Sequence, residues 1–262
     1  MIMRTPIIDG RSIEQFIPAN LRGMFYNHPL PAYKYAIHNG KDPYGFPANG
    51  LVFYAPLWAI KNNVAFKSVD AYRHPCTKTN APWSPSGSAF SGTGKIVVPD
   101  HATFNITTTL TVLQWVKVTN ILAIAHSFTN KYVATTANRE WNFCKHTNTG
   151  KLEIFFGDPV NGTYEGDQLT DAAHLVNNIW GLVGFTFNAG TPIIYFNGAA
   201  VASSLSDGAI PATLFNGSAN VQLGAQESAQ YLVGSEGDSW IYNRVLTPSE
   251  ILNVYNCTKW RY

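Results

Sequence analysis

The sequence predicts an all-β protein, a two-sheet antiparallel β-sandwich of the jelly-roll type, and three observations support this. Charged residues make up only 13% of the 262 residues, where an average globular chain has about a quarter. The place of the missing charged residues is taken by Asn, Thr, Ser, Gly and Tyr. This composition is typical of the surface of a β protein, whereas helical surfaces are rich in Glu and Lys. From Gly50 onward, short β-favouring runs alternate with turn signals, and only one strong helix signal follows them.

The predicted strands are short and are separated by turn residues. Asn148-Thr-Gly150 and Asn197-Gly198 each follow such a run, and Asn-Gly favours the positive φ angles of a two-residue hairpin. Gly237 and Ser239 indicate a turn that leads into the last strand. The predicted strands cover residues 51–57, 95–98, 109–118, 121–127, 140–145, 152–156, 180–187, 193–196, 220–223 and 239–242.

One helix is predicted near the C-terminal end. Thr247-Pro-Ser-Glu250 places Thr at the N-cap, Pro at the first helical position and Glu at the third. The helix then continues through residues 251–255. Together with the many strands, this single short helix favours a sandwich over an α/β fold.

Residues 1–48 differ from the rest and are predicted to form an irregular N-terminal arm. They hold six of the fifteen prolines, together with many aromatic residues. Ser12-Ile-Glu-Gln15 fits a capping box and predicts a helical turn over residues 13–16. Because the arm is too aromatic to stay solvated, we expect it to lie along a surface of its own domain or of a partner. The sandwich would then span residues 49–262.

Charge and hydropathy exclude several classes of protein. The net charge is +2 without any run of Lys or Arg, so a nucleic-acid partner is not expected. The apolar stretches are far shorter than the ~20 residues that span a membrane. No apolar run follows the first residues, which predicts synthesis in the cytoplasm without a secretory signal peptide. Cys76, Cys144 and Cys257 lack metal-ligand spacing and are expected to be mainly buried free thiols.

Three stretches carry a resemblance to a known family. They are Phe90-Ser-Gly-Thr-Gly-Lys-Ile-Val-Val-Pro-Asp100, Trp180-Gly-Leu-Val-Gly-Phe-Thr-Phe-Asn188 with Ile194-Tyr-Phe-Asn-Gly198, and Gly237-Asp-Ser-Trp-Ile-Tyr-Asn-Arg-Val-Leu-Thr-Pro-Ser-Glu-Ile251. In this order they resemble the laminin-G-like branch of the concanavalin A-like lectin/glucanase superfamily, over about residues 50–256. The resemblance implies a jelly-roll sandwich. Trp115, Trp180 and Trp240 are expected to face its interior, because apolar residues lie two positions away from each.

The sequence predicts no catalytic residues. The glucanase branch supplies its carboxylates as Glu-x-Asp-x-x-Glu on one strand, and retaining enzymes need two of them about 5–5.5 Å apart. Glu236-Gly-Asp238 begins that pattern, but Ile241 stands where the second glutamate would be. Asp167 and Asp171 are expected in a polar loop. No nucleophile elbow accompanies the histidines, so each is expected to be solvated or to make one hydrogen bond.

The resemblance suggests at most one metal, a structural calcium ion held by Asp238. Relatives often complete such a site with an acidic loop after the first strand. Here residues 58–63 offer a lysine and two amides instead, while Ca²⁺ takes several carboxylates among about six to eight oxygens. No other cofactor is expected.

Glycan binding is the ligand class that the resemblance favours. Lectin sites stack sugar rings on exposed aromatic side chains and bind hydroxyl groups through Asn and Asp. The candidate ligand-binding residues are Trp83, Tyr132, Trp141 and Tyr164. The alternative for each is an anchor that buries its ring locally.

These observations predict a non-catalytic binding or structural module. The family that the chain resembles is usually a display module of extracellular proteins, but no export signal is predicted here. This combination favours a virion-associated protein, such as a capsid decoration, head-fibre or tail component. Residues 1–48 would dock it to virion proteins in an oligomeric assembly, and the sandwich would face outward, at the virion or extracellular surface. The alternatives are a lectin-like extracellular carbohydrate-binding protein and a polysaccharide-active enzyme.

Overall fold

A computed structural model describes residues 7–8, 11–12, 45–61, 64–227 and 229–262 of the chain. The chain divides into two units, Met1–Asn49 and Gly50–Tyr262. In the first unit, β1 (Ile7–Ile8) pairs antiparallel with β2 (Arg11–Ser12). The helical turn predicted over residues 13–16 lies outside the described residues, as does most of the predicted arm.

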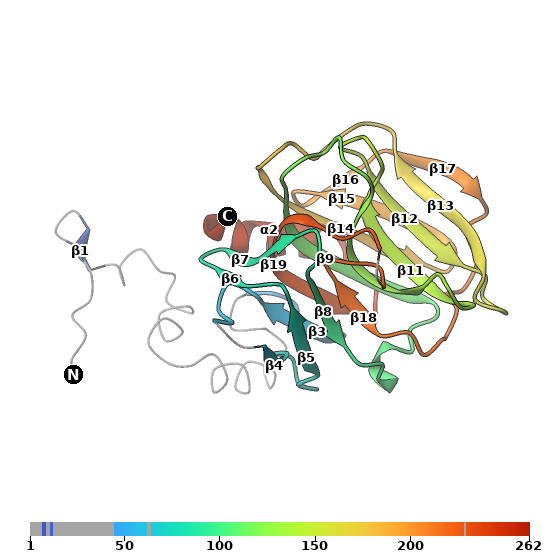
Figure 1. Cartoon of the computed structure of the whole chain (residues 1–262), viewed down its shortest axis with the longest axis horizontal. Coiled ribbons are helices and arrows are strands. Elements are labelled where there is room, and N and C mark those ends of the chain that lie inside the picture. The colour runs from blue at the N-terminus through green and yellow to red at the C-terminus, as the bar shows by residue number, and fades with distance from the viewer. Residues whose placement is uncertain (1–6, 9–10, 13–44, 62–63, 228) are drawn as a thin grey trace. The chain divides into compact units, whose positions relative to one another are not determined.

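The second unit is a sandwich of two antiparallel sheets, and the predicted all-β fold is confirmed (Figure 1). The nine-stranded sheet has the order β17-β13-β12-β11-β10-β18-β8-β5-β4. Its strands are β17 (Ser203–Gly208), β13 (Tyr164–Thr170), β12 (Leu152–Gly157), β11 (Asn138–Lys145), β10 (His126–Val133), β18 (Val221–Leu223), β8 (Lys95–Val98), β5 (Pro75–Thr79) and β4 (Ala65–Lys67).

The eight-stranded sheet has the order β16-β15-β14-β9-β19-β7-β6, and β3 pairs with the second half of β19. Its strands are β16 (Ala199–Val201), β15 (Thr191–Phe196), β14 (Trp180–Asn188), β9 (Thr109–Val118), β19 (Val233–Tyr242), β7 (Gly87–Ser91), β6 (Trp83–Ser84) and β3 (Leu51–Pro56). The short 3-10 turn η3 (Ala102–Phe104) precedes β9.

Most of the predicted strands are present, and two local predictions need correction. Asn197 and Gly198 have φ angles of 50° and 87° and form the predicted hairpin between β15 and β16. The strand predicted over residues 121–127 starts only at His126, because Lys145 Nζ donates to the carbonyls of Ile121 and Ala123 and holds this segment as a loop. The turn predicted at residues 237–239 is wrong, since this segment lies inside β19.

The interior between the sheets is packed with alternating apolar side chains. Phe143 contacts both Phe128 and Phe185, at ring-centroid distances of 5.9 and 5.4 Å, and so joins strands of both sheets. Two of the cysteines, Cys76 and Cys144, are buried free thiols. Because burial of aliphatic and aromatic surface is the main stabilising contribution to folding, this layer holds the sandwich together.

A second packed layer covers the outer face of the eight-stranded sheet. Trp115 does not face the interior as predicted; its ring stacks on Tyr262 with centroids 4.4 Å apart, and its Nε1 donates to Thr258 Oγ1 at 2.8 Å. Trp240 is also on this face, stacked on Tyr54 at 5.5 Å. The period-two pattern identified both positions as buried but could not tell which side of the sheet buries them, because this sheet is covered on both sides.

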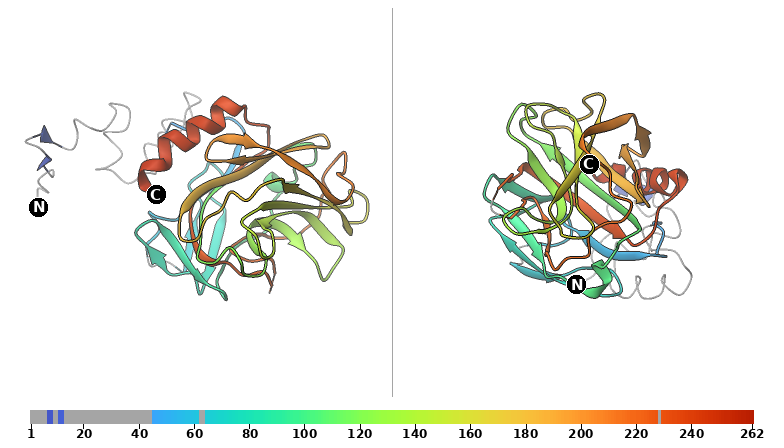
Figure 2. Two further views of the ribbon diagram at one scale, coloured as in Figure 1. Left: turned by 90° about the horizontal axis from the view of Figure 1, so that it is seen from above. Right: turned by 90° about the vertical axis from the view of Figure 1, so that its right-hand side faces the viewer.

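Helix α2 (Pro248–Thr258) provides this cover, with η4 (Lys259–Arg261) after it, and lies on the outside of the sandwich (Figure 2). The predicted start is confirmed: Thr247 caps the helix and Glu250 closes the capping box. In the residues that the structure describes, none of the helices has the length and apolar character needed to cross a bilayer.

Candidate functional site

Asp238, the predicted calcium ligand, is fully buried and surrounded by the protein's own donors. Its Oδ1 accepts hydrogen bonds from Tyr54 Oη at 3.1 Å and Trp58 Nε1 at 3.0 Å. Its Oδ2 accepts from Arg261 Nη1 at 2.5 Å and Tyr262 Oη at 3.0 Å. An arginine therefore occupies the position where a cation would bind, and these residues do not fit Ca²⁺, which needs several oxygen ligands.

Glu236 and Asp238 do not share a face of β19, although they stand two positions apart. Between Glu236 and Ser239, β19 has one residue more than the paired segment of β9, which is a β-bulge. The bulge interrupts the alternation of β19, so the two carboxyl groups point to opposite faces. Glu236 lies in the interior, with Gln114 and the backbone of Gly224 as polar neighbours, and burial raises its pKa well above its usual range. The carboxylate arrangement of a glucanase is therefore not formed at this strand.

The structure separates the four candidate ligand-binding residues. Trp141 and Tyr132 are 3% and 6% exposed, so the expectation that they present rings to solvent is wrong. Trp141 packs edge-on against Phe185 in the interior, as its alternation with Phe143 along β11 requires. Trp83 is half-buried in β6, where its Nε1 donates to the carbonyl of Trp58 at 2.7 Å. Tyr164 is half-buried at the start of β13, in a different part of the nine-stranded sheet.

Around Tyr164 the register brings together a set of polar residues that the sequence did not reveal as a group. The interior-facing residues of β12 are Leu152, Ile154 and Phe156, so Phe155 points outward. Directly paired residues continue this line across the outer face of six strands. We call these residues the polar row: Gln222, Asn130, Asn142, Phe155, Asp167 and Asp207, from β18 to β17. Strands β11, β12, β13 and β17 can be followed in Figure 1.

One half of the polar row is closed over by the loop that follows β18. Asn142 Nδ2 donates to Gln226 Oε1 at 3.4 Å and to Gln230 Oε1 at 3.2 Å. Asn130 Nδ2 donates to the carbonyl of Ala225 at 2.7 Å. As a result Asn130 and Asn142 are 0% and 1% exposed. This closed half, Gln222, Asn130 and Asn142, holds the loop in place.

The other half of the row consists of Phe155, Asp167 and Asp207, of which Phe155 is half-buried and Asp207 is exposed. We call these three residues, together with Tyr164, the open half. The rings of Phe155 and Tyr164 lie 6.2 Å apart. Tyr164 Oη donates to Asp167 Oδ2 at 2.7 Å and to Asp207 Oδ2 at 3.2 Å. Burial, assisted by these carboxylates, raises the pKa of Tyr164 well above its usual range, so the hydroxyl keeps its proton. Asp167 is only 4% exposed, and its Oδ1 has no hydrogen-bond partner among the described residues.

Glu153 stands two residues before Phe155 on the same face of β12 and so lies next to the open half. It lies next to Cys144 of β11, whose Sγ is 3.8 Å from Glu153 Oε2, and His146 Nε2 is 3.9 Å from Oε1. Burial first, and then the charge of Asp167, raise the pKa of Glu153 to about 7. Two carboxyl groups of neighbouring strands thus interact on this face, and one of them holds its proton more tightly than usual.

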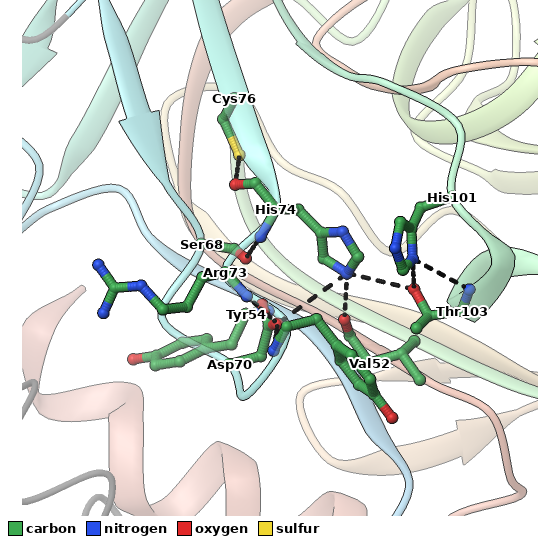
Figure 3. A network of polar contacts seen from close by, with 10 residues as sticks. Val52, Tyr54, Ser68, Asp70, Arg73, His74, Cys76, His101 and Thr103 are labelled. Carbon is green, nitrogen blue, oxygen red and sulfur yellow. Dashed lines mark hydrogen bonds and ion pairs between the residues drawn. The ribbon is translucent and has the colours of Figure 1, made fainter.

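A second polar network, around His74, is structural (Figure 3). Asp70 accepts hydrogen bonds from the backbone N–H groups of Tyr54, Tyr72 and Arg73, which fixes the loop before β5. Of the two environments expected for a histidine, solvated or with one hydrogen bond, the first is wrong for His74, which is buried. Its Nε2 lies 3.0 Å from the carbonyl of Val52, which can only accept. The Nε2 atom therefore carries the proton, and burial lowers the pKa of this histidine.

Sequence reasoning missed Asp167 and its neighbours on the polar row. Asp167 was expected in a loop, whereas it lies in β13 between β12 and β17. The alternation of Leu152, Ile154 and Phe156 with Glu153 and Phe155 could have marked the outward side of β12. The partners on the next strands depend on register, which is a property of the folded sheet. Within the described residues, no cluster of three or more His, Cys, Asp or Glu side chains suits a metal ion.

Comparisons with known proteins agree with this architecture. A family model described as the concanavalin A-like lectin/glucanases superfamily matches residues 90–252. This match spans more than half of the chain. The chain belongs to that superfamily. The resemblance predicted from the sequence is therefore confirmed. A search of curated protein sequences finds no match.

Several solved structures share the sandwich fold of this chain, although their sequences differ widely from it. The receptor-binding domain of botulinum neurotoxin C/D mosaic serotype is 18% identical with a TM-score of 0.60, over 80% of this chain and 51% of that one. The serotype D ligand-binding domain, solved with N-acetylneuraminic acid, is 18% identical with a TM-score of 0.59, over 80% and 52%. This chain thus spans about half the length of those toxin domains.

A shorter structure is matched over nearly its whole length. Domain 4 of AbnA, an extracellular GH43 arabinanase from Geobacillus stearothermophilus in complex with arabinotriose, is 15% identical with a TM-score of 0.57. The match covers 78% of this chain and 98% of that domain. At such identities the likeness establishes a shared fold.

Proposed function

We propose that this chain is a non-catalytic, lectin-like carbohydrate-binding module whose ligand site is the open half of the polar row. The observation that carries the proposal is the pairing of two half-buried aromatic rings, Phe155 and Tyr164, with a buried carboxylate oxygen that lacks a partner, Asp167 Oδ1. Sugars offer an apolar ring face and hydroxyl donors, which these two features complement. The superfamily supports this ligand class, as do the neighbours solved with N-acetylneuraminic acid and arabinotriose.

The proposal is tested by glycan-array screening of the full chain, followed by calorimetric titration of each bound oligosaccharide. We expect Tyr164→Ala to weaken binding at least about tenfold, since the loss of a ring contact and of a hydroxyl donor each cost on the order of 1 kcal/mol. Tyr72→Ala is the matched control, because Tyr72 is 51% exposed and lies near the His74 network instead. Equal affinities of the Tyr164 and Tyr72 variants would refute this site, provided that circular dichroism shows both folded.

A second candidate function is cleavage of a polysaccharide, and one observation favours it. Glu153 and Asp167 form an interacting carboxyl pair in which Glu153 has its pKa raised to about 7, a value suited to a general acid. Reducing-end release from the bound glycan would reveal turnover, and Glu153→Gln would abolish it. Binding without turnover, unaffected by Glu153→Gln, supports the non-catalytic module.

The setting in which the module acts is a further part of the proposal. We propose display on a virion, as a capsid decoration, head-fibre or tail component, with residues 1–48 as the docking arm. The six prolines and many aromatic residues of the arm support docking to a partner surface. Mass spectrometry of purified particles would detect the chain, and a chain lacking residues 1–48 would be missing from them. Equal incorporation of both chains would contradict the role of the arm.

A further inference from the structure

We infer that the open half of the polar row selects uncharged glycans that present neighbouring hydroxyl groups, and that it excludes acidic glycans. The inference rests on the proposed function, because it concerns the ligand of the same site. Its basis is an excess of hydrogen-bond acceptors over donors around Tyr164. The hydroxyl of Tyr164 has one hydrogen, yet it lies within hydrogen-bond distance of two carboxylates, Asp167 and Asp207.

The acceptor excess extends along the whole polar row. Three buried oxygens of the row have no hydrogen-bond partner within the described part of the chain: Gln222 Oε1, Asn130 Oδ1 and Asp167 Oδ1. All three belong to residues that are 6% exposed or less. Each is an acceptor, so the row lacks donors rather than acceptors. Only the oxygen of Asp167 belongs to the open half, where the half-buried rings of Phe155 and Tyr164 and the exposed Asp207 are its neighbours.

Three basic side chains on or directly after β11 contact groups other than Asp167. Arg139 donates from Nη2 to the carbonyl of Ala134 and lies over the ring of Tyr132. Lys145 Nζ donates to three backbone carbonyls, at Ile121, Ala123 and His146. His146 Nε2 lies 3.9 Å from Glu153 Oε1. None of these three side chains donates a hydrogen bond to Asp167 Oδ1.

An acidic sugar would therefore meet carboxylates without a counter-ion. Its own carboxylate or sulfate brings acceptors and negative charge to a site that already holds Asp167 and Asp207. In a partly buried site this repulsion is screened less than at an open surface. Neighbouring hydroxyls of a neutral sugar supply two donors at once, and a carboxylate accepts such donors through its two oxygens. The rings of Phe155 and Tyr164 complement the apolar C–H face of the same sugar.

The test uses the full chain with neutral and acidic oligosaccharides of similar size. One pair is N-acetyllactosamine and its 3′-sialylated form. In addition, three neutral hexasaccharides (cellohexaose, xylohexaose and maltohexaose) are compared with two acidic ones (hexagalacturonate and a heparin hexasaccharide). We expect calorimetric binding of at least one neutral member and of no acidic member. Asp167→Asn should weaken neutral binding about tenfold, a loss of about 1.4 kcal/mol, because the charged acceptor is removed.

Asp171→Asn is the control variant. It removes one carboxylate near the same end of the sheet, but Asp171 is exposed and already accepts from Ser204 Oγ at 2.8 Å. We expect its affinity to stay within about twofold of that of the wild type. Preferential binding of an acidic glycan, or equal effects of the Asp167 and Asp171 variants, would overturn the selectivity while a Tyr164-dependent glycan site stands. If no oligosaccharide binds, the proposed function itself fails.

Discussion

Asp238 and Asp167 are both nearly buried aspartates on the outer faces of the two sheets, but their oxygens meet different numbers of donors. Asp238 has four side-chain donors, from Tyr54, Trp58, Arg261 and Tyr262. Asp167 has one, which it shares with Asp207. The carboxylate that the resemblance marks for a metal is therefore saturated by the protein. The carboxylate of Asp167, by contrast, keeps one oxygen without a donor among the described residues.

The largest effect on stability is expected when the carboxylate of Asp238, which has four side-chain donors, loses its charge. Asp238→Asn leaves Arg261 buried without its anionic partner, and breaking a buried ion pair in this way costs about 3–5 kcal/mol. Urea unfolding followed by circular dichroism measures this loss, and glycan affinity in the folded variant should stay unchanged. A loss below about 1 kcal/mol would mean that Asp238 is not the structural centre of its face.

The next largest effect on stability is expected at the buried carboxyl of Glu236, and this effect depends on pH. Burial raises the pKa of Glu236, so the folded chain holds a proton that the unfolded chain releases above about pH 4.5. Between the unfolded and folded pKa values, stability therefore falls by about 1.4 kcal/mol per pH unit as the pH rises. Glu236→Gln removes this dependence, so the variant should be more stable than the wild type at pH 8.

The advantage of Glu236→Gln should disappear near pH 4, where both states of the wild type are protonated. Some pH dependence remains in the variant, because the raised pKa values of Glu140 (about 8) and Glu153 (about 7) act in the same direction. Unfolding free energies at several pH values measure both effects. A variant that is less stable than the wild type at pH 8 would contradict a neutral Glu236.

A moderate effect is expected from the helix that covers the eight-stranded sheet. Thr247→Ala removes the N-cap acceptor of Glu250 N and breaks the capping box, which costs about 1 kcal/mol. Thr247→Ser keeps the oxygen and should restore most of the stability. Thermal unfolding of the two variants compares them directly. Because no such helix covers the polar row, glycan binding should be the same in both.

The smallest effect on stability is expected at Asp167, whose carboxylate has one side-chain donor. Asp167→Asn should cost less than about 1 kcal/mol of unfolding free energy, because the amide keeps an oxygen that can accept from Tyr164 Oη. The same variant should lower the pKa of Glu153 from about 7, because the charge of Asp167 helps to raise it. Carbon-detected NMR titration of the Glu153 carboxyl measures the shift. Asp171→Asn should leave that pKa where it is in the wild type.

The sequence was sufficient for the fold but only partly so for the site. Alternation and turn residues predicted strands such as β9 and the Asn197-Gly198 hairpin, because local patterns determine them. Helix α2 was predicted from its cap for the same reason. Strand β13 was missed, since the segment Tyr164–Thr170 is mostly polar and is a strand only because β12 and β17 pair with both of its edges.

Of the predicted ligand-binding residues, Tyr164 lies beside Asp167, while Tyr132 and Trp141 are buried. Aromatic character is visible in a sequence, but the face on which a ring lies depends on register and on what covers that face. The polar row shows the same limit. Asn130, Asn142 and Asp167 come from three separate stretches, and the residue-by-residue pairing of β10 to β13 alone places them in line.

The bulge in β19 also determines how the gene can change by insertion or deletion. Loss of a single codon at Gly237 would restore strict alternation with β9, because Glu236 and Ser239 already pair with Val116 and Gln114, which stand two positions apart. Asp238 would then stand between them and keep the outer face, where Arg261 remains its partner. A change in length by one residue at the bulge is consequently compatible with the present faces of this strand.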